Sequence, residues 1–377
     1  MKNNKKKKKA PILPMILLLL IGVGCGLLAV RLIPDTLYDL PLPQFLGVLT
    51  LFLLLLYLVF FLHIIIHEAG HLVFGLLSGY RFSSYRIGGL MLLRRDGKLR
   101  LCRMSLAGTG GQCLMIPPEE RDGRIPVLLY NLGGSLMNLA AALVFLILWI
   151  PLRESSYVAA ALMLLVIIGV MQAAINGIPM RLGMVDNDGY NAFAIRKDLA
   201  SMRAFRQQLL VNAAVTEGMR LSEMPAEYFA LPENADLQNS MVATVAVFAC
   251  NRLMDEGRYA EADAEMQNLL AADTGMVDLH RYLLLCDRIL CALLDRRGRE
   301  AQALWEDKGM QNFLKQMRRF PTVIRTVYAV ARLGTGDGRA AERAAADFEK
   351  CARRYPYPGD LAAERELMAL CDPDRFR

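Results

Sequence analysis

The chain has 377 residues, of which 54% are hydrophobic, and its formal net charge is +7. This composition is too apolar for an ordinary soluble protein, and the length allows two domains. Six lysines among the first nine residues supply much of the positive charge, which favours a membrane-topology signal over nucleic-acid binding. Eight cysteines without a Cys-x-x-Cys pair argue against a disulfide framework and indicate reduced thiols.

Four apolar segments are long enough to span a bilayer: 10–33, 45–77, 125–151 and 157–179. We interpret the first as a retained signal-anchor helix rather than a removed signal peptide. The lysines before it, and the seven arginines and lysines of residues 81–103 after the second segment, indicate the cytoplasmic side. The sequence therefore predicts a multi-pass protein of the cell membrane, with its N-terminus and everything after about residue 180 in the cytoplasm.

The second apolar segment contains a His-Glu-x-x-His motif formed by His67, Glu68 and His71. On a helix the two histidines share a face and can bind one zinc ion, while Glu68 can take a proton from the metal-bound water. Ionisable side chains are costly within a membrane and usually mark a working site. The motif predicts hydrolysis of a membrane-embedded substrate. His63, one helical turn earlier, is interpreted as lining a polar cavity, in preference to supporting a metal ligand or relaying protons.

The arginine-rich loop after this segment contains a hairpin signal. Residues 89–94 and 99–104 flank Asp96 and Gly97, a pair that supplies the positive φ of a tight turn. We expect an amphipathic hairpin at the membrane surface, in preference to an edge strand that captures an extended substrate. The glycines and prolines of 110–118 indicate an irregular loop that re-enters the site region.

A catalytic zinc ion usually takes three protein ligands, so a third is needed. In the predicted topology the fourth apolar segment runs parallel to the second and ends on the same side. It closes with Asn176 and Pro179, and Asp186 and Asp188 follow. Pro179 and the nearby glycines break the helix, so the chain can bend back toward the histidines. Either aspartate could supply the third ligand.

The chain from about residue 200 has a soluble, helical character. Gly-Arg pairs at Gly257, Gly298 and Gly338 each follow one helical stretch and open another, at a period of about 40 residues. This spacing predicts a tetratricopeptide-like array of helix pairs, with an irregular helical bundle as the alternative. No catalytic constellation occurs in this part of the sequence, and His280 is interpreted as structural or exposed.

As a set, these motifs resemble those of the site-2 protease family of intramembrane metalloproteases. Besides the His-Glu-x-x-His motif, the resemblance rests on Asp188-Gly189 after an Asn-x-x-Pro element, and on a Gly-x-x-x-Asn element that ends at Asn138. Ser135 stands where the family usually has proline. The resemblance covers about residues 45–195.

This resemblance implies peptide-bond hydrolysis within or beside the membrane, with Zn²⁺ as cofactor and a membrane protein or peptide as substrate. It favours Asp188 as the third ligand, since Gly189 follows it, and keeps Asp186 in reserve. In such a site Asn138 and Asn176 could donate hydrogen bonds to the substrate backbone or the oxyanion, and the alternative for either is that it satisfies a helix break.

We therefore expect a mainly α-helical protein with about four transmembrane helices, a small β-hairpin and a soluble α-helical repeat-like domain. The predicted divisions are a signal anchor and external link (1–41), a metalloprotease core (42–199) and a cytoplasmic helical domain (200–377). The predicted function is that of a zinc metalloendopeptidase, with a protein partner for the tail and no nucleic acid. The alternatives are a catalytically inactive scaffold that binds partners through its tail, and a transporter.

Overall fold

The computed structural model describes residues 12–30, 39–104, 110–154, 156–180, 186–232 and 234–372. The lysine cluster therefore lies outside the described residues. The chain divides into two compact units that do not follow chain order. The first, here named the membrane unit, comprises Met1–Ser78, Pro126–Leu182 and Asp186–Ala194. The second, here named the sheet–helix unit, comprises Gly79–Ile125, Gly183–Val185 and Ile195–Arg377.

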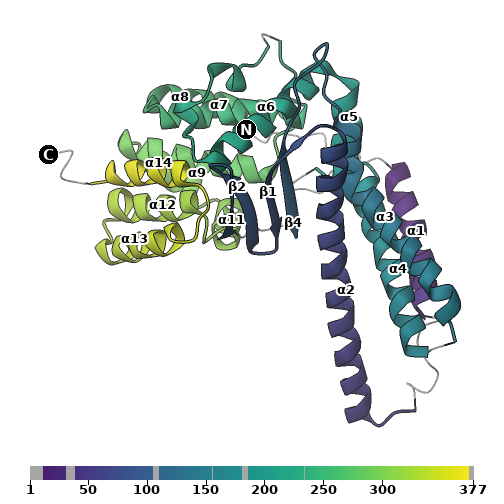
Figure 1. The fold of residues 1–377 in the computed structure, drawn as a ribbon. Coiled ribbons are helices and arrows are strands. Elements are labelled where there is room, and N and C mark those ends of the chain that lie inside the picture. Colours follow the sequence, from purple (N-terminus) through teal and green to yellow (C-terminus); the bar gives the residue numbers. More distant parts are fainter. Residues whose placement is uncertain are drawn as a thin grey trace. The chain divides into compact units, whose positions relative to one another are not determined.

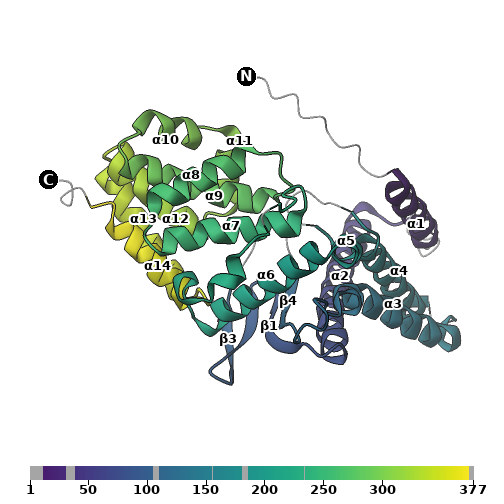
Figure 2. The same ribbon diagram turned by 90° about the horizontal axis from the view of Figure 1, so that it is seen from above.

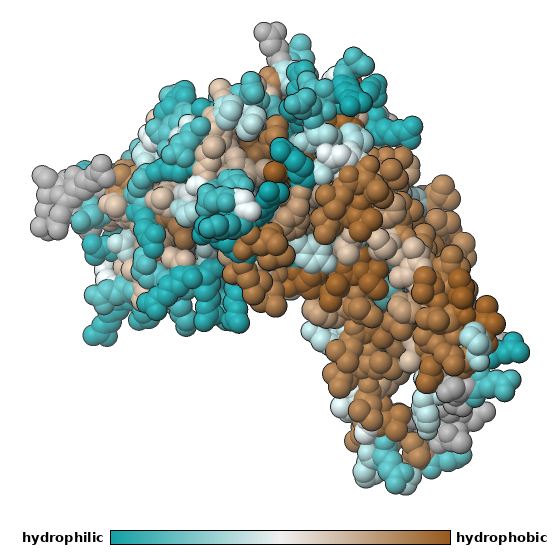
Figure 3. Space-filling view, viewed as in Figure 1, coloured by the Kyte–Doolittle hydropathy of each residue, from teal (hydrophilic) through white to brown (hydrophobic). Residues whose placement is uncertain are grey.

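Four long helices form the body of the membrane unit: α1 (Ile12–Val30), α2 (Leu42–Leu77), α3 (Val127–Leu152) and α4 (Ser156–Gly177) (Figure 1). Each is long and apolar enough to cross a membrane, which confirms the predicted number of spans. The face of these helices seen in Figure 3 is mostly hydrophobic, with hydrophilic residues at its lower end. Leucines that would be costly in water, such as Leu53 and Leu143, are more than half exposed and suit contact with lipid tails.

Helices α2 and α3 approach each other closely because glycine faces glycine. A Cβ atom on Gly70 would lie 2.3 Å from the carbonyl oxygen of Gly133, and a Cβ on Gly133 would lie 2.7 Å from that of Gly70. Small residues allow this backbone contact between membrane helices, where van der Waals packing drives association. The contact falls within the His-Glu-x-x-His turn, so it fixes the motif against α3.

The sheet–helix unit begins with four antiparallel strands: β1 (Arg81–Ile87), β2 (Leu90–Arg95), β3 (Lys98–Arg103) and β4 (Gly111–Ile116). Their order is β3-β2-β1-β4. The predicted hairpin is confirmed: β2 pairs with β3 around Asp96 and Gly97, whose φ angles are +53° and +72°. Helix α6 (Leu199–Glu217) packs on the sheet, as Figure 2 shows.

The irregular loop predicted for 110–118 is wrong for its central part. Residues Gly111–Ile116 form β4, which pairs with β1 from Arg81↔Ile116 to Ile87↔Gly111. The buried side chains Cys113 and Met115 alternate along this strand, and such alternation is the pattern of a half-buried strand. Flanking glycines and prolines hid that signal, since they mark only the ends of the strand.

Helices make up the remainder of the sheet–helix unit: α7 (Ser240–Asp255), α8 (Tyr259–Ala271), α9 (Asp278–Leu294), α10 (Gly298–Trp305), α11 (Lys308–Gln316), α12 (Pro321–Ala329), α13 (Gly338–Ala352) and α14 (Pro358–Ala369). Short 3₁₀ turns cover Leu221–Glu223 and Ala226–Phe229, and a π-helical turn, Val330–Gly334, follows α12. Each predicted Gly-Arg pair lies where one helix gives way to the next. The tetratricopeptide assignment stays a prediction.

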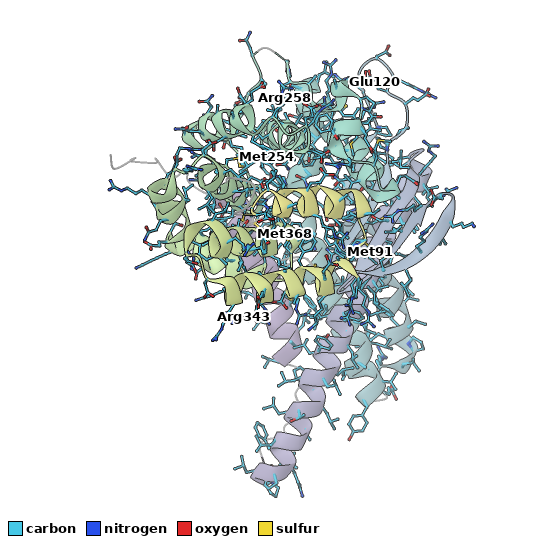
Figure 4. All side chains as sticks on the ribbon, turned by 90° about the vertical axis from the view of Figure 1, so that its left-hand side faces the viewer. Met91, Glu120, Met254, Arg258, Arg343 and Met368 are labelled. Carbon is cyan, nitrogen blue, oxygen red and sulfur yellow. The ribbon has the colours of Figure 1, made fainter. Side chains whose placement is uncertain are left out.

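Two features tie the C-terminal helices to each other and to the sheet. Arg325 on α12 is fully buried and pairs with Asp287 on α9 and Glu364 on α14. Met91 on β2 is buried against Tyr357, which precedes α14, and Met254 on α7 is buried among the helices (Figure 4). The sheet thus shares a core with the last part of the chain.

Helix α5 (Asp188–Lys197) begins in the membrane unit and leads into the sheet–helix unit. Its first residue is the aspartate that the sequence favoured as a metal ligand. This placement brings Asp188 into the same compact unit as α2.

Candidate metal centre

Three side chains from two helices converge in the membrane unit. His67 and His71 lie one turn apart on α2, both less than a tenth exposed, with their Nε2 atoms 3.1 Å apart. Oδ2 of Asp188 lies 2.9 Å from Nε2 of His67 and 3.3 Å from Nε2 of His71. Among the described residues, these three form the group of histidine, cysteine and acidic side chains close enough to hold one metal ion.

Asp188 is held in place by the residue before it. The Asn187 side chain accepts hydrogen bonds from the backbone N–H groups of Tyr190 and Met180, at 2.8 and 3.0 Å. Its amide nitrogen donates to the carbonyls of Ile175 and Ile178, at 2.7 and 2.6 Å. Asn187 therefore caps α5 and fastens it to the end of α4.

Glycine allows α5 to start against the end of α4. A Cβ atom on Gly189 would lie 2.2 Å from the carbonyl oxygen of Gly177, so any larger residue would push α5 away. This gives the Asp-Gly pair a physical meaning: the glycine provides the close approach and the aspartate enters the site.

Helix α3 positions the rings of the two histidines. A Cβ atom on Gly134 would lie 2.4 to 2.6 Å from ring atoms of His67, so the glycine makes room for that ring. Nδ1 of His71 lies 2.8 Å from the carbonyl oxygen of Tyr130. A carbonyl only accepts hydrogen bonds, so Nδ1 carries the proton and Nε2 of His71 is left with its lone pair toward Asp188.

The three donor atoms fit a zinc ion. A tetrahedral zinc site with bonds of about 2.0 Å separates its ligand atoms by about 3.3 Å. The observed separations of 2.9, 3.1 and 3.3 Å lie close to that value. Two imidazole nitrogens and one carboxylate oxygen are also a donor set of catalytic zinc sites, which leave a fourth position open.

The electrostatics of Asp188 favour the ionised ligand. Burial raises the pKa of this carboxyl, but the neighbouring imidazoles of His71 and His67 outweigh the effect of burial. The net effect holds the pKa of Asp188 well below its usual range. A carboxylate is the form that binds a metal.

The other predicted site residues are placed differently. Glu68 follows His67 on α2 and is buried. Asn138 on α3 is fully buried between His63 and His67, where its side-chain amide lies 3.0 and 3.4 Å from their Nδ1 atoms. Asn176 donates to the carbonyl of Gln172 within α4, at 3.0 Å. Asp186 does not belong to the converging group.

Two partners of the site were missed in the sequence. Asn187 had a usable signal, because asparagine directly before a helix start is a preferred cap. The carbonyl of Tyr130 had none, since a backbone group carries no side-chain signature.

Comparison with known families agrees with this geometry. The profile described as "Peptidase family M50" matches residues 55–337, which is well over half of the chain. No curated protein and no solved structure matches the chain. The match covers α2 with its histidines, the sheet, α5 and most of the C-terminal helices. The chain is therefore a membrane protein that belongs to peptidase family M50, the site-2 protease family of zinc metalloproteases.

Proposed function

We propose that this protein is an active intramembrane zinc endopeptidase that hydrolyses peptide bonds of membrane-embedded or membrane-adjacent proteins. One observation carries the proposal: the donor atoms of His67, His71 and Asp188 lie within hydrogen-bonding distance of one another in a unit made of membrane-spanning helices. Such a cluster has little structural value in an apolar bilayer, where polar groups are expensive and functional. Family membership supports the same activity.

In the proposed mechanism, His67, His71 and Asp188 hold the zinc ion. When bound, the ion lowers the pKa of a water molecule and polarises the scissile carbonyl. Glu68 accepts a proton from the attacking water as the new C–O bond forms. The same carboxyl then gives the proton to the departing amine nitrogen as the C–N bond breaks. Glu68 is buried and directly follows His67 on α2, and this position beside a proposed zinc ligand supports its role.

We propose a cytoplasmic N-terminus, a cytoplasmic sheet–helix unit and a zinc site near the cytoplasmic end of α2. The arginines of β1 to β3 support this orientation, because cytoplasmic loops carry an excess of basic residues. His67 and His71 lie in the last third of α2, on the side from which the chain enters β1.

We propose that the helices α7 to α14 bind a protein partner or a substrate. They contribute no residue to the metal group among the described residues, and stacked helix pairs present extended surfaces without chemistry of their own. Crosslinking in cells of the full chain carrying Glu68→Gln is expected to place substrate contacts on these helices. Crosslinks confined to the membrane helices would reject a recruiting role.

The variant Glu68→Gln tests the catalytic proposal. It keeps the shape of the side chain and removes the base, so zinc is expected to stay bound while cleavage falls by a factor of about 10² to 10⁴. Comparing membrane peptides from cells with the wild-type and variant chains would identify native substrates. An active Glu68→Gln protein would reject the mechanism, and a zinc-bound wild-type protein without cleavage would favour an inactive scaffold.

A further inference from the structure

His63 is the buried polar residue of α2 that the proposed mechanism does not use. His63 has no exposed surface and lies one helical turn before His67. Nε2 of His63 lies 2.9 Å from the carbonyl oxygen of Leu165 on α4. Nδ1 lies 3.0 Å from Oδ1 of Asn138 on α3. His63 therefore links three membrane helices.

Helix α4 is built to receive this ring. A Cβ atom on Gly169 would lie 2.7 Å from Cε1 of His63 and 3.2 Å from Cβ of Ala142. Any side chain at position 169 would expel the imidazole from the Leu165 carbonyl. The glycine, the carbonyl and the histidine thus form one arrangement.

The Leu165 carbonyl decides where the proton of His63 lies. A carbonyl oxygen only accepts hydrogen bonds, so Nε2 of His63 must carry the proton. In the neutral ring Nδ1 then has a lone pair and needs a donor. The only donor of the Asn138 side chain is its NH₂ group. The opposite orientation of the amide would set two acceptors against each other or require a fully buried imidazolium.

The orientation of Asn138 in turn decides where the proton of His67 lies. The oxygen and nitrogen of an amide exchange places by a half-turn, so hydrogen bonding selects between them. Hydrogen bonding therefore selects the half-turned amide over the placement with Oδ1 toward His63 and Nδ2 toward His67. After the half-turn, NH₂ faces His63 and the amide oxygen faces Nδ1 of His67. Nδ1 of His67 then carries the proton and donates it. Nε2 of His67 is left with a lone pair beside Asp188 and His71.

We propose that His63 is a positioning residue that holds His67 in its metal-binding tautomer through Asn138. The chain of hydrogen bonds runs from the Leu165 carbonyl through His63 and Asn138 to His67. This inference rests on the proposed zinc site. It gives His67 the kind of support that the Tyr130 carbonyl gives His71 directly.

The zinc affinity of the full chain in detergent, measured by chelator competition, tests the proposal. His63→Leu is expected to weaken zinc binding about tenfold or more, the usual cost of losing an outer partner of a ligand. Gly169→Ala is expected to weaken zinc binding similarly, because it displaces the His63 ring while residue 63 itself stays histidine. In an Asn138→Asp background the carboxylate accepts from His67 unaided, so His63→Leu should then have little effect.

Equal losses from His63→Leu in both backgrounds would overturn the proposal, because a packing defect does not depend on the chemistry of residue 138. His280→Gln, a histidine variant in the sheet–helix unit, is the matched control and should leave zinc affinity unchanged. A wild-type chain that binds no zinc would instead refute the proposed function.

Nitrogen NMR of the wild-type zinc form gives a second readout. It needs no substitution, so a folding defect of a variant cannot affect the result. The chain has four histidines, so labelling histidine alone with ¹⁵N yields few ring signals. We expect a proton on Nε2 of His63 and on Nδ1 of His67. A zinc-bound protein with the His63 proton on Nδ1 would contradict the proposed chain of hydrogen bonds.

Discussion

The two units bury polar side chains in opposite ways. In the sheet–helix unit, buried charges cancel one another: Arg325 pairs with Asp287 and Glu364, and Arg288 pairs with Asp263 and Glu300. Each such pair ties neighbouring helices together. In the membrane unit three polar side chains, those of His67, His71 and Asp188, converge on one point.

This difference separates structural from functional burial. An ion pair whose charges balance needs no further partner, and its loss costs stability. Two histidines and a carboxylate gathered at one point are satisfied best by a metal ion, and their loss should cost binding and catalysis. Variants in the two units should therefore fail in different assays.

The largest expected effect is the loss of the metal. His67→Ala combined with His71→Ala removes two of three ligands, so zinc retained after purification should fall to background and cleavage should disappear. Metal analysis of the purified chain measures this.

Asp188→Ala and Asp186→Ala form a matched pair for the third ligand. The first should lose zinc and the second should keep it, because only Asp188 joins the two histidines in the structure. Zinc loss in Asp186→Ala with zinc retained in Asp188→Ala would reverse the assignment.

Arg325→Met should give the opposite phenotype. It leaves Asp287 and Glu364 buried without their cation, which should destabilise the sheet–helix unit by about 3–5 kcal/mol. Denaturant unfolding of the full chain measures this loss, and zinc content in native buffer is expected to stay at the wild-type level. Arg258→Met, whose exposed charge belongs to surface pairs, is the control and should change stability little. Zinc loss in folded Arg325→Met would contradict the claim that zinc binding does not depend on the buried ion pairs of the sheet–helix unit.

A smaller expected effect is a dependence of the stability of the sheet–helix unit on pH. Burial raises the pKa of Asp360 to about 7, although the Tyr355 hydroxyl donates to it. The folded state therefore keeps a proton that the unfolded state releases near pH 4. Its contribution to stability is present below pH 4 and is lost as pH rises toward 7.

Asp360→Asn should remove this dependence. The free energy of unfolding of the variant should exceed that of the wild type at pH 8, by on the order of 1–3 kcal/mol, and the gap should close toward pH 4. Unfolding curves at the two pH values measure it. A wild-type stability that rises between pH 5 and 7, and that Asp360→Asn leaves unchanged, would contradict a neutral Asp360 carboxyl in the folded state.

The proposed orientation predicts a labelling pattern with no effect on activity. A cysteine replacing Asp39, before α2, should react with an impermeant thiol reagent outside intact cells, and one replacing Lys98 on β3 should not. Both positions lie outside the spans. Labelling of the β3 cysteine from outside would invert the topology.

Much of the membrane unit was predictable because its signals are local. Apolar runs of the required length gave the four spans, and His67, Glu68 and His71 lie within one helical turn. The sequence favoured Asp188 over Asp186 only through the glycine that follows it, and in the structure Gly189 lets α5 approach the end of α4.

What escaped prediction depends on contacts distant in sequence. Strand β4 pairs with β1 across about thirty residues, and Tyr357 covers Met91 from the far end of the chain. The partner of His71 is a backbone carbonyl, and the Asn138 amide lies between two histidines of another helix. No local periodicity reports such contacts.

The central claim is that His67, His71 and Asp188 bind one zinc ion, and X-ray absorption at the zinc edge tests it most directly. For the purified wild-type chain, we expect about one zinc with nitrogen and oxygen ligands at about 2.0–2.2 Å, including two imidazoles. Asp188→Ala should lose one oxygen ligand or the metal itself. Sulfur ligands at about 2.3 Å, or a spectrum unchanged by Asp188→Ala, would contradict the account.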